Sequence, residues 1–266
     1  MAGQQAAANY KESFILTAAH GRMHWFEAGS GSPMILIHTN GGSAYQYTKV
    51  FEHLSGKHRV ISWEMPGHGD TDPLSRHYSI EDYCDALACF MDVIDIPAAH
   101  VAGTSCGGTI VACFANRFAS RTLSVAIVET PLRNYDDWGA RWGHTEGNFG
   151  LPTQTIEEVS QRVANVDEAF LTRWNIDRNK AGAKTMMSVM WAMRDYDVQK
   201  AVASVARPAT MVYGAKGPTI GLRDRLEKLN PKLPVAVLDH SGHFPMLDEP
   251  QRFAQILADL AKSAGG

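Results

Sequence analysis

Residues 100–108, HVAGTSCGG, join a short apolar run to a segment with helical character, and this stretch decides the fold. Within it, residues 103–107 fit the pattern G-x-S-x-G, which is informative only where a strand passes into a helix. A sharp turn of this kind forces its central residue into a strained backbone conformation, so neighbouring side chains have to be nearly absent. The pattern therefore predicts that the hydroxyl of Ser105 is exposed above the carboxyl end of a sheet. It also leaves the amide of Cys106 at a helix N-terminus, where it can donate to a developing oxyanion.

A glycine-rich turn of this kind can also have a role outside catalysis. It can pack a strand tightly against a helix, or it can hold a phosphate group at the helix N-terminus. Segments before and after the turn favour the catalytic interpretation, because both sides carry the partners that such a serine needs.

Short apolar runs alternate with helical segments along the chain. The expected strands are residues 14–17, 23–29, 33–38, 58–64, 100–105, 124–129, 208–214 and 233–239. The expected helices are residues 79–93, 106–118 and 249–262. Ser79 and Asp82 have the spacing of an N-cap and its capping-box partner. Strands separated by helices form βαβ units, so we expect an α/β fold with a mostly parallel eight-stranded sheet flanked by helices. The first two strands, joined by a short Gly turn, should form an antiparallel edge.

The alternation stops between residues 131 and 203, where Trp, Met and helix-forming residues are frequent. We interpret this segment as a helical cap inserted after the sixth strand. The chain then divides into a core domain, residues 1–130 and 204–266, and a cap domain, residues 131–203. Aromatic and Met side chains suit an adaptable apolar pocket, but they can equally form the core of the cap itself.

Three further segments accompany the turn at Ser105. Residues 38–42 (HTNGG) follow the third strand, residues 65–69 (MPGHG) follow the fourth, and residues 241–250 (SGHFPMLDEP) follow the last. With these segments the chain resembles the α/β-hydrolase superfamily over nearly its whole length. The resemblance implies the α/β-hydrolase fold and a catalytic triad in the chain order Ser, acid, His.

The expected base is His243. A serine hydroxyl needs an imidazole that takes its proton and returns it to the leaving group. Of the eleven histidines, His243 alone follows the last strand on a Gly-containing loop. His38 and His68 are interpreted as structural loop residues. His240 is the alternative base and is expected at the surface or at a hinge.

The acid departs from the common pattern of the superfamily. After the seventh strand most relatives have Gly-x-x-Asp, whereas residues 214–217 here are Gly-Ala-Lys-Gly. Glu129 ends the sixth strand at the same sheet edge, and a subset of the superfamily takes its acid from this place. We therefore expect Glu129 to orient the imidazole, a role worth about 10⁴ in rate in the serine-protease template. Asp224 is the main rival and Asp239 a weaker one, and a purely structural role is the alternative for Glu129.

The resemblance also suggests the oxyanion hole and the substrate contacts. The backbone amides of Asn40 and Cys106 are the expected oxyanion donors, and the Asn40 side chain would add a polar contact or narrow the pocket. Serine at position 105 excludes the chemistry of haloalkane dehalogenases and epoxide hydrolases, which use aspartate there. Ser105, the glutamate after the sixth strand and residues 213–219 (YGAKGPT) are similar to the zearalenone lactonases, which open a resorcylic macrolactone. By that match Trp191 would face the substrate, and Leu132 and Gly41 are the other expected substrate-binding residues.

Composition argues against several classes of partner. With 25 basic and 28 acidic residues and a net charge of −3, nothing favours nucleic acid or an anionic membrane. The chain has no run of eighteen apolar residues, and its polar start has no basic region before an apolar stretch. The four cysteines lack C-x-x-C spacing and are expected to be reduced and buried. We expect a cytoplasmic protein without metal, organic cofactor, nucleic-acid partner or membrane partner, and a homodimer is the assembly to consider.

Together these residues predict a serine hydrolase that cleaves a small apolar ester or lactone through an acyl-enzyme. A carbon–carbon bond hydrolase, a hydroxynitrile lyase or an acyltransferase would use the same triad. A receptor-like binding protein with a vestigial triad is the non-enzymatic alternative.

Overall fold

The computed structural model describes residues 10–151 and 153–265, and it contains an eight-stranded sheet. Most of the polar start, for which no leader is expected, falls in residues 1–9 and lies outside the described residues. The strand order is β1-β2-β4-β3-β5-β6-β7-β8. The strands are β1 (Lys11–Thr17), β2 (Gly21–Ala28), β3 (Ser32–Ile37), β4 (His58–Trp63), β5 (Ala99–Thr104), β6 (Thr122–Val128), β7 (Ala209–Gly214) and β8 (Val235–Leu238).

The sheet is mostly parallel. Strand β1 pairs with β2 and β2 with β4 in antiparallel fashion, and every pair from β4–β3 to β7–β8 is parallel. The expected α/β class, the eight strands and the antiparallel edge are thus confirmed. Because the parallel strands run the same way, their carboxyl ends share one sheet edge, where ligands bind in open α/β sheets.

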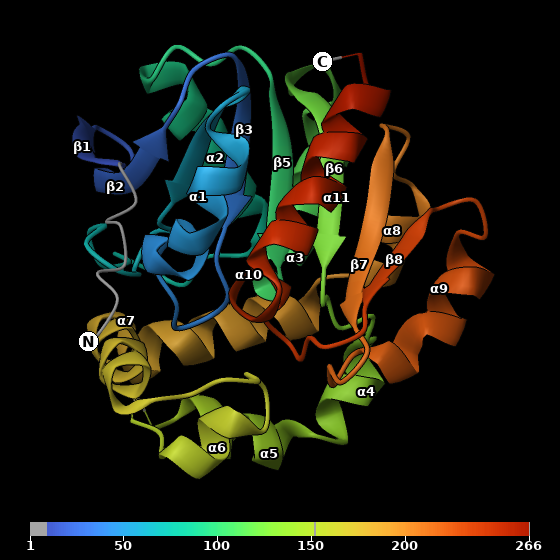
Figure 1. Cartoon of the computed structure of the whole chain (residues 1–266). Coiled ribbons are helices and arrows are strands. Elements are labelled where there is room, and N and C mark those ends of the chain that lie inside the picture. The colour runs from blue at the N-terminus through green and yellow to red at the C-terminus, as the bar shows by residue number, and fades with distance from the viewer. Residues whose placement is uncertain (1–9, 152, 266) are drawn as a thin grey trace, which may run out of the picture.

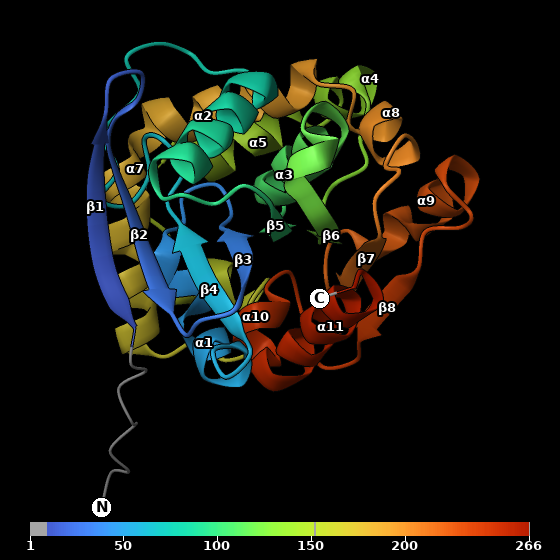
Figure 2. The ribbon, with the colours of Figure 1, turned by 90° about the horizontal axis from the view of Figure 1, so that it is seen from above.

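Helices cover both faces of the sheet, as Figure 2 shows from above. In β3 the side chains of Met34 and Leu36 pack with α1 (Thr48–Leu54) and α11 (Pro250–Ser263). Those of Ile35 and Ile37 pack with α2 (Ile80–Val93) and α3 (Cys106–Arg117) on the other face. Both faces of the parallel strands are therefore apolar, which explains their continuous apolar runs. The helices and 3-10 turns (η) are η1 (Ala44–Tyr47), α1 (Thr48–Leu54), α2 (Ile80–Val93), α3 (Cys106–Arg117), η2 (Ala119–Arg121), α4 (Tyr135–Gly139), α5 (Trp142–Phe149), α6 (Ile156–Ser160), α7 (Glu168–Asp195), α8 (Val198–Ala203), η3 (Ile220–Leu222), α9 (Arg223–Leu229), α10 (Pro245–Asp248) and α11 (Pro250–Ser263).

Helices α4 to α8 lie between β6 and β7 in the chain, and Figure 1 shows α4 to α7 gathered at one end of the sheet. Helix α7 is kinked at Gly182, whose backbone angles are φ 70° and ψ 159°. Five aromatic and Met side chains of this segment are buried and belong to the hydrophobic core: Trp138, Trp174, Met186, Met190 and Met193. Tyr135 and Trp191 are exposed, with 60% and 48% of their surfaces accessible to solvent.

The cysteines and the helices give no sign of a disulfide or of a membrane span. All four cysteines are free, and Cys89 is only partly buried, contrary to the expectation of burial for all four. Among the described residues, none of the helices has the length and apolar character needed to span a membrane.

Candidate active site

Ser105 lies at the turn between β5 and α3 with a strained backbone. Its angles are φ 58° and ψ −114°, and the residue is the N-cap of α3. Among the described residues, the other non-glycine positions with positive φ are Asp95 and Glu129. Two of these three strained residues are thus proposed members of one site, which is where such strain is commonly found.

The glycines at the turn are required by close approach of backbone. A Cβ atom on Gly107 would lie 2.8 Å from the carbonyl oxygen of His38, and one on Gly103 would overlap the backbone of Gly107. Within the part of the chain that the structure describes, the Ser105 hydroxyl makes no hydrogen bond, and the residue is partly exposed. The hydroxyl is therefore free to meet a substrate, and catalytic hydrogen bonds often tighten only when one is bound.

Glu129 is a fully buried carboxylate with a complete set of donors. It accepts hydrogen bonds from the Gly214 amide (2.7 Å), the Thr219 hydroxyl (2.6 Å) and Nδ1 of His243 (3.0 Å). Its side chain is 0% exposed and that of His243 is 12% exposed. These donors hold the carboxylate against the imidazole, an arrangement that selects the tautomer with a proton on Nδ1 and leaves Nε2 as the acceptor.

Gly217 accounts for the absence of the common aspartate. A Cβ atom built at Gly217 would overlap the carboxylate of Glu129. The carboxylate from β6 therefore fills the space next to this loop. The rivals Asp224 and Asp239 are exposed, and neither contacts His243.

The loop that carries His243 is held from both sides. A Cβ atom on Gly214, at the end of β7, would overlap the carbonyl oxygen of Gly242, so the loop lies directly on the strand end. The His243 amide donates to the carbonyl of Arg162 at 2.9 Å, and the Gly242 amide donates to Oδ2 of Asp248 at 2.8 Å. The imidazole is thereby fixed by the sheet edge and by the cap together.

The other histidines of the sequence motifs are structural. Nδ1 of His38 donates to the Thr39 carbonyl (2.8 Å), and its Nε2 accepts from the Met65 amide (3.1 Å). Burial lowers the pKa of His38 to about 3 and that of His68 to about 4. Both imidazoles are therefore neutral at pH 7 and tie loops together. His240 is exposed.

The two expected oxyanion donors lie close to one another. Cys106 is the first residue of α3, where the amide has no partner within its own helix. Burial raises the pKa of the Cys106 thiol to about 12, and the backbone amides of Gly107, Asn40 and Cys106 oppose that rise. A Cβ atom on Gly107 would overlap the carbonyl oxygen of Ile37, so the loop that carries Asn40 lies against the first turn of α3, which carries Cys106.

The expected substrate-binding residues are not assembled in one pocket. Leu132 is fully buried in the core. Gly41 lines a pocket of about 220 Å³ between the loop after β3 and α7, with Tyr45, Phe170 and Trp174 among its walls. Trp191 lines a different pocket of about 420 Å³, next to the loop before α2. The centroid of its indole lies 6.2 Å from that of the His77 ring. Trp191 as a substrate contact stays a prediction.

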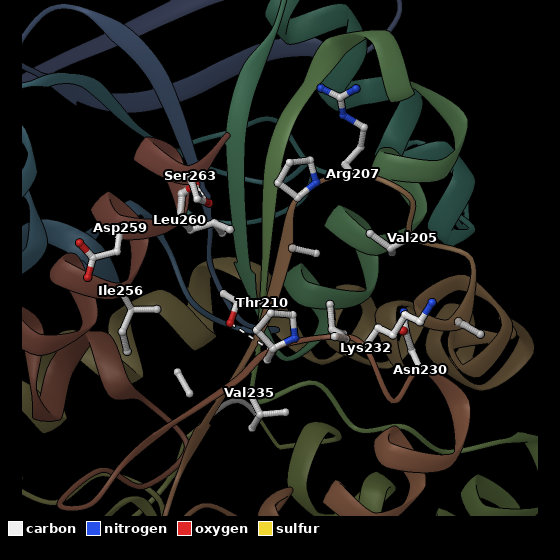
Figure 3. Close-up of a pocket in the computed structure, with 16 residues that line it drawn as sticks. Val205, Arg207, Thr210, Asn230, Lys232, Val235, Ile256, Asp259, Leu260 and Ser263 are labelled. Carbon is white, nitrogen blue, oxygen red and sulfur yellow. Dashed lines mark hydrogen bonds between the residues drawn. The ribbon is translucent and has the colours of Figure 1, made fainter. Parts of the chain in front are cut away.

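A larger pocket of about 740 Å³ lies away from these residues. It opens where β7 and β8 begin and is bordered by the last turns of α11 (Figure 3). Since the triad candidates follow the opposite ends of the strands, this pocket has no part in the chemistry of the triad. Among the described residues, the group that brings metal-ligating atoms within 4.8 Å of one another is Glu12, His24 and Asp70. Asp70 is paired with Lys180 and His24 with Glu64, so the donors of this group are already used.

The sequence does not predict two of the hydrogen-bond donors to Glu129, the Gly214 amide and the Thr219 hydroxyl. Thr219 ends the run that resembles the lactonase loop, but no motif marks it as a donor. A polar residue five positions beyond Gly214 is a signal for such a donor, but only with knowledge of how the loop folds.

A family model described as the alpha/beta hydrolase fold matches residues 32–151. The chain has the α/β-hydrolase fold. An acetyltransferase component of the acetoin cleaving system of Pseudomonas putida is 26% identical over 254 residues, 90% of this chain and 67% of that protein. The 3-oxoadipate enol-lactonase 1 of Acinetobacter baylyi is 23% identical, with 79% of this chain and 81% of the lactonase covered.

Solved structures agree with this fold. An N-acyl homoserine lactonase in complex with N-hexanoyl homoserine is 25% identical, with 96% of this chain and 98% of the lactonase covered and a TM-score of 0.81. A bacterial membrane phospholipase A is 20% identical, with 98% and 89% covered and a TM-score of 0.84, and it is similar in fold. The chain spans only 41% of a second acetyltransferase component, from Cupriavidus necator. The fold, the family model and the hydrolases among these relatives support a hydrolase enzyme.

Proposed function

We propose that this α/β hydrolase cleaves a carboxylic ester or lactone through an acyl-enzyme on Ser105. The observation that carries the proposal is the hydrogen bond of 3.0 Å between Nδ1 of His243 and the buried Glu129 carboxylate. Ser105, whose backbone is strained, is the proposed nucleophile, and its hydroxyl makes no hydrogen bond to His243 or to any other described residue. A nucleophile, a base and an orienting carboxylate are the three parts that such chemistry requires.

The reaction proceeds in two halves. Nε2 of His243 takes the proton of the Ser105 hydroxyl as Oγ attacks the substrate carbonyl, and the amides of Asn40 and Cys106 stabilise the resulting oxyanion. The tetrahedral intermediate collapses, the carbon–oxygen bond to the leaving alkoxide breaks, and the imidazolium protonates that alkoxide. Water, deprotonated by the same imidazole, then hydrolyses the acyl-enzyme and releases the acid. A lactone gives a single hydroxy acid, because its alcohol and acyl parts are joined.

We place the substrate among small apolar esters and lactones, with an aromatic macrolactone such as zearalenone as the specific candidate. Similarity of residues 213–219 and of the Ser–His–Glu plan to the zearalenone lactonases supports it, as do the relatives named lactonases. The pocket beside Gly41 has aromatic walls from Tyr45, Phe170 and Trp174, which suit an aromatic ring. We assign the reaction to the cytoplasm, with no nucleic-acid or membrane partner and with a homodimer as the assembly to test.

Turnover of a generic aryl ester and of a macrolactone tests the proposal. Wild-type protein should hydrolyse nitrophenyl acetate, and Ser105→Ala should be slower by about 10³-fold or more, because the nucleophile is gone. Zearalenone and simple aryl esters, assayed side by side, separate a lactonase from a general esterase. Equal turnover by the wild type and Ser105→Ala would contradict the proposed role of the serine.

Carbon–carbon bond hydrolysis is the second candidate. The 2-hydroxy-6-oxo-2,4-heptadienoate hydrolase of Pseudomonas putida is 23% identical, with 88% of this chain and 90% of that enzyme covered. A vinylogous diketone in the same panel distinguishes the two, since only a carbon–carbon hydrolase will cleave it faster than the esters.

A further inference from the structure

The loop that carries Asn40 is braced firmly on its core side. Gln46 accepts from the Thr39 amide at 3.0 Å and donates to the Thr39 hydroxyl at 2.9 Å. The Gly42 amide donates to the Thr39 carbonyl at 2.9 Å, which closes a turn around Asn40 and Gly41. Thr39 and Gly42 are thus held, and the peptide between them depends on further contacts.

Those contacts come from the cap. Nδ2 of Asn40 donates to the backbone carbonyl of Met186 in α7 at 2.9 Å, and Oδ1 accepts from Nε2 of His68 at 3.3 Å. Asn40 is 8% exposed, so an unmet amide here would be costly. A Cβ atom on Gly41 would lie 2.8 Å from Sδ of Met186, which shows how closely the loop and the helix approach. Both ends of the Asn40 side chain are therefore fixed, one to the core and one to the cap.

Met186 belongs to the part of α7 that follows the kink. Gly182 breaks the helical backbone angles one turn before Met186, with nothing near the position of a Cβ atom. The segment after the kink is thus a separate helical piece. Its position relative to the sheet decides whether the Met186 carbonyl meets the Asn40 side chain.

We propose that Asn40 is a positioning residue whose side chain ties an oxyanion-hole amide to the second half of α7, so that the hole is complete only when this part of the cap is seated. This inference rests on the proposed function, because it concerns the oxyanion of that reaction. The side chain acts through its own backbone: held at Met186 and His68, it fixes the direction of the Asn40 N–H. A donor displaced by a fraction of an ångström stabilises the tetrahedral intermediate less while substrate binding is kept.

Two substitutions at Asn40 test the inference on an aryl ester that the wild type hydrolyses. Asn40→Ala removes both side-chain contacts and keeps the backbone amide. Asn40→Asp keeps size and the acceptor for His68 but sets an oxygen against the Met186 carbonyl. Each should lower kcat about 10- to 100-fold with KM within about twofold, since only transition-state stabilisation is lost. Affinity for phenylboronic acid, which forms a tetrahedral adduct on serine, should fall in step with kcat/KM.

Asn116 provides a matched control. Its Nδ2 also donates to a backbone carbonyl of the insert, that of Ala201 in α8, at 2.8 Å, but it lies on α3 away from the loop after β3. Asn116→Ala should keep kcat within about twofold, because it removes a core-to-cap hydrogen bond without touching the oxyanion donors.

Gly182→Ala tests whether the position of the second half of α7 affects catalysis. Its positive φ strains an alanine, which moves the kink without filling any contact. It should lower kcat in the wild type and have a much smaller effect in Asn40→Ala, because the tie is already absent there.

The outcomes separate the two proposals. An active wild type whose kcat is unchanged in Asn40→Ala, or in Asn40→Asp where the alanine variant does not fold, overturns this inference alone. Equal loss in Asn116→Ala also overturns it, since any core-to-cap contact would then suffice. A wild type that hydrolyses no ester overturns the proposed function, and this inference with it.

Discussion

Two buried glutamate–histidine pairs occur among the residues that the structure describes, and only one of these two has the form of an active site. Glu129 follows β6 and Glu64 follows β4, both are buried, and each binds Nδ1 of a histidine, at 3.0 Å for His243 and 2.7 Å for His24. Each carboxylate also fills the space where a glycine lacks a side chain, Gly217 for Glu129 and Gly69 for Glu64.

The pairs differ at the second nitrogen of the imidazole. Nε2 of His24 is bound to Glu12 at 2.8 Å, and the His24 side chain is 0% exposed. Among the described residues, Nε2 of His243 has no partner, and its side chain is 12% exposed. A buried carboxylate that orients an imidazole is therefore not enough. The free nitrogen, in a site with an unpartnered serine hydroxyl, distinguishes a base from a structural histidine.

The largest expected effect is on catalysis at the first pair. Glu129→Gln should lower kcat about 10³- to 10⁴-fold, because the amide no longer stabilises the imidazolium or selects its tautomer. Steady-state hydrolysis of an aryl ester measures it. A kcat of Glu129→Gln within tenfold of the wild-type value would show that Glu129 has a structural role only.

A carboxylate introduced at position 217 tests whether the acid of the proposed triad can come from another loop. In the Glu129→Ala background, Gly217→Asp introduces a carboxylate at the position where the resemblance to α/β hydrolases places the acid. The Glu129 carboxylate, which occupies this space in the wild type, is absent from that variant. We expect the double variant to regain at least about tenfold in kcat over Glu129→Ala, since orientation of the imidazole is partly restored. No gain, with the fold intact by circular dichroism, would argue that the site accepts its acid only from β6.

The second pair should affect stability and leave chemistry alone. The Glu64 carboxylate also accepts from the amides of Ala44 (3.1 Å) and Asp70 (2.6 Å). Glu64→Gln should lower the free energy of unfolding by about 3 kcal/mol, because a buried, hydrogen-bonded charge is lost. Urea unfolding measures the change, and kcat of the folded variant should stay within about twofold. A large loss of kcat without loss of stability would reverse the assignment of the two pairs.

The smallest effect is a pH dependence at His24. Burial lowers the pKa of His24, but the hydrogen bond and charge of Glu64, with those of Glu12, outweigh burial and raise it. A raised pKa in the folded state stabilises the protein at pH values below the ordinary range of histidine, about 6.5, and this contribution is lost as pH rises through the folded-state pKa. Glu12→Gln removes part of it. The difference in unfolding free energy between wild type and Glu12→Gln, below about 1 kcal/mol for this half-exposed partner, should be larger at low pH than at high pH. Urea unfolding on both sides of the transition measures it, and a difference independent of pH would contradict the sign.

The sequence predicts the features that depend on neighbouring residues, and it does not predict the contacts between residues far apart in the chain. The turn at Ser105 needs only five neighbouring residues, and the alternation of apolar runs with helices indicates a parallel sheet. Glu129 stands out in the sequence because Gly217 leaves no carboxylate in the usual loop. Other contacts join residues that lie 85 to 146 positions apart in the chain. They are the hydrogen bonds from Gly214 and Thr219 to Glu129 and the one from Asn40 to Met186. No periodicity or spacing reports contacts of that range, since they depend on where the cap and the loops settle.

The role of Trp191 stays a prediction from a resemblance. The run around it resembles a segment with a substrate-contacting tryptophan in the zearalenone lactonases, but that resemblance does not say how the part of α7 after the kink at Gly182 packs against the loop before α2. A side chain beyond such a kink is not placed by its neighbours in sequence.

Labelling with a fluorophosphonate tests the central claim without knowledge of the substrate, because the probe reports only how strongly the serine is activated. We expect one adduct, on Ser105, by intact mass and peptide mapping. The labelling rate constant should fall about 10³-fold or more in Glu129→Ala and stay within about twofold in Asp224→Ala. An adduct elsewhere, or equal rates for the wild type and Glu129→Ala, would contradict the proposed triad.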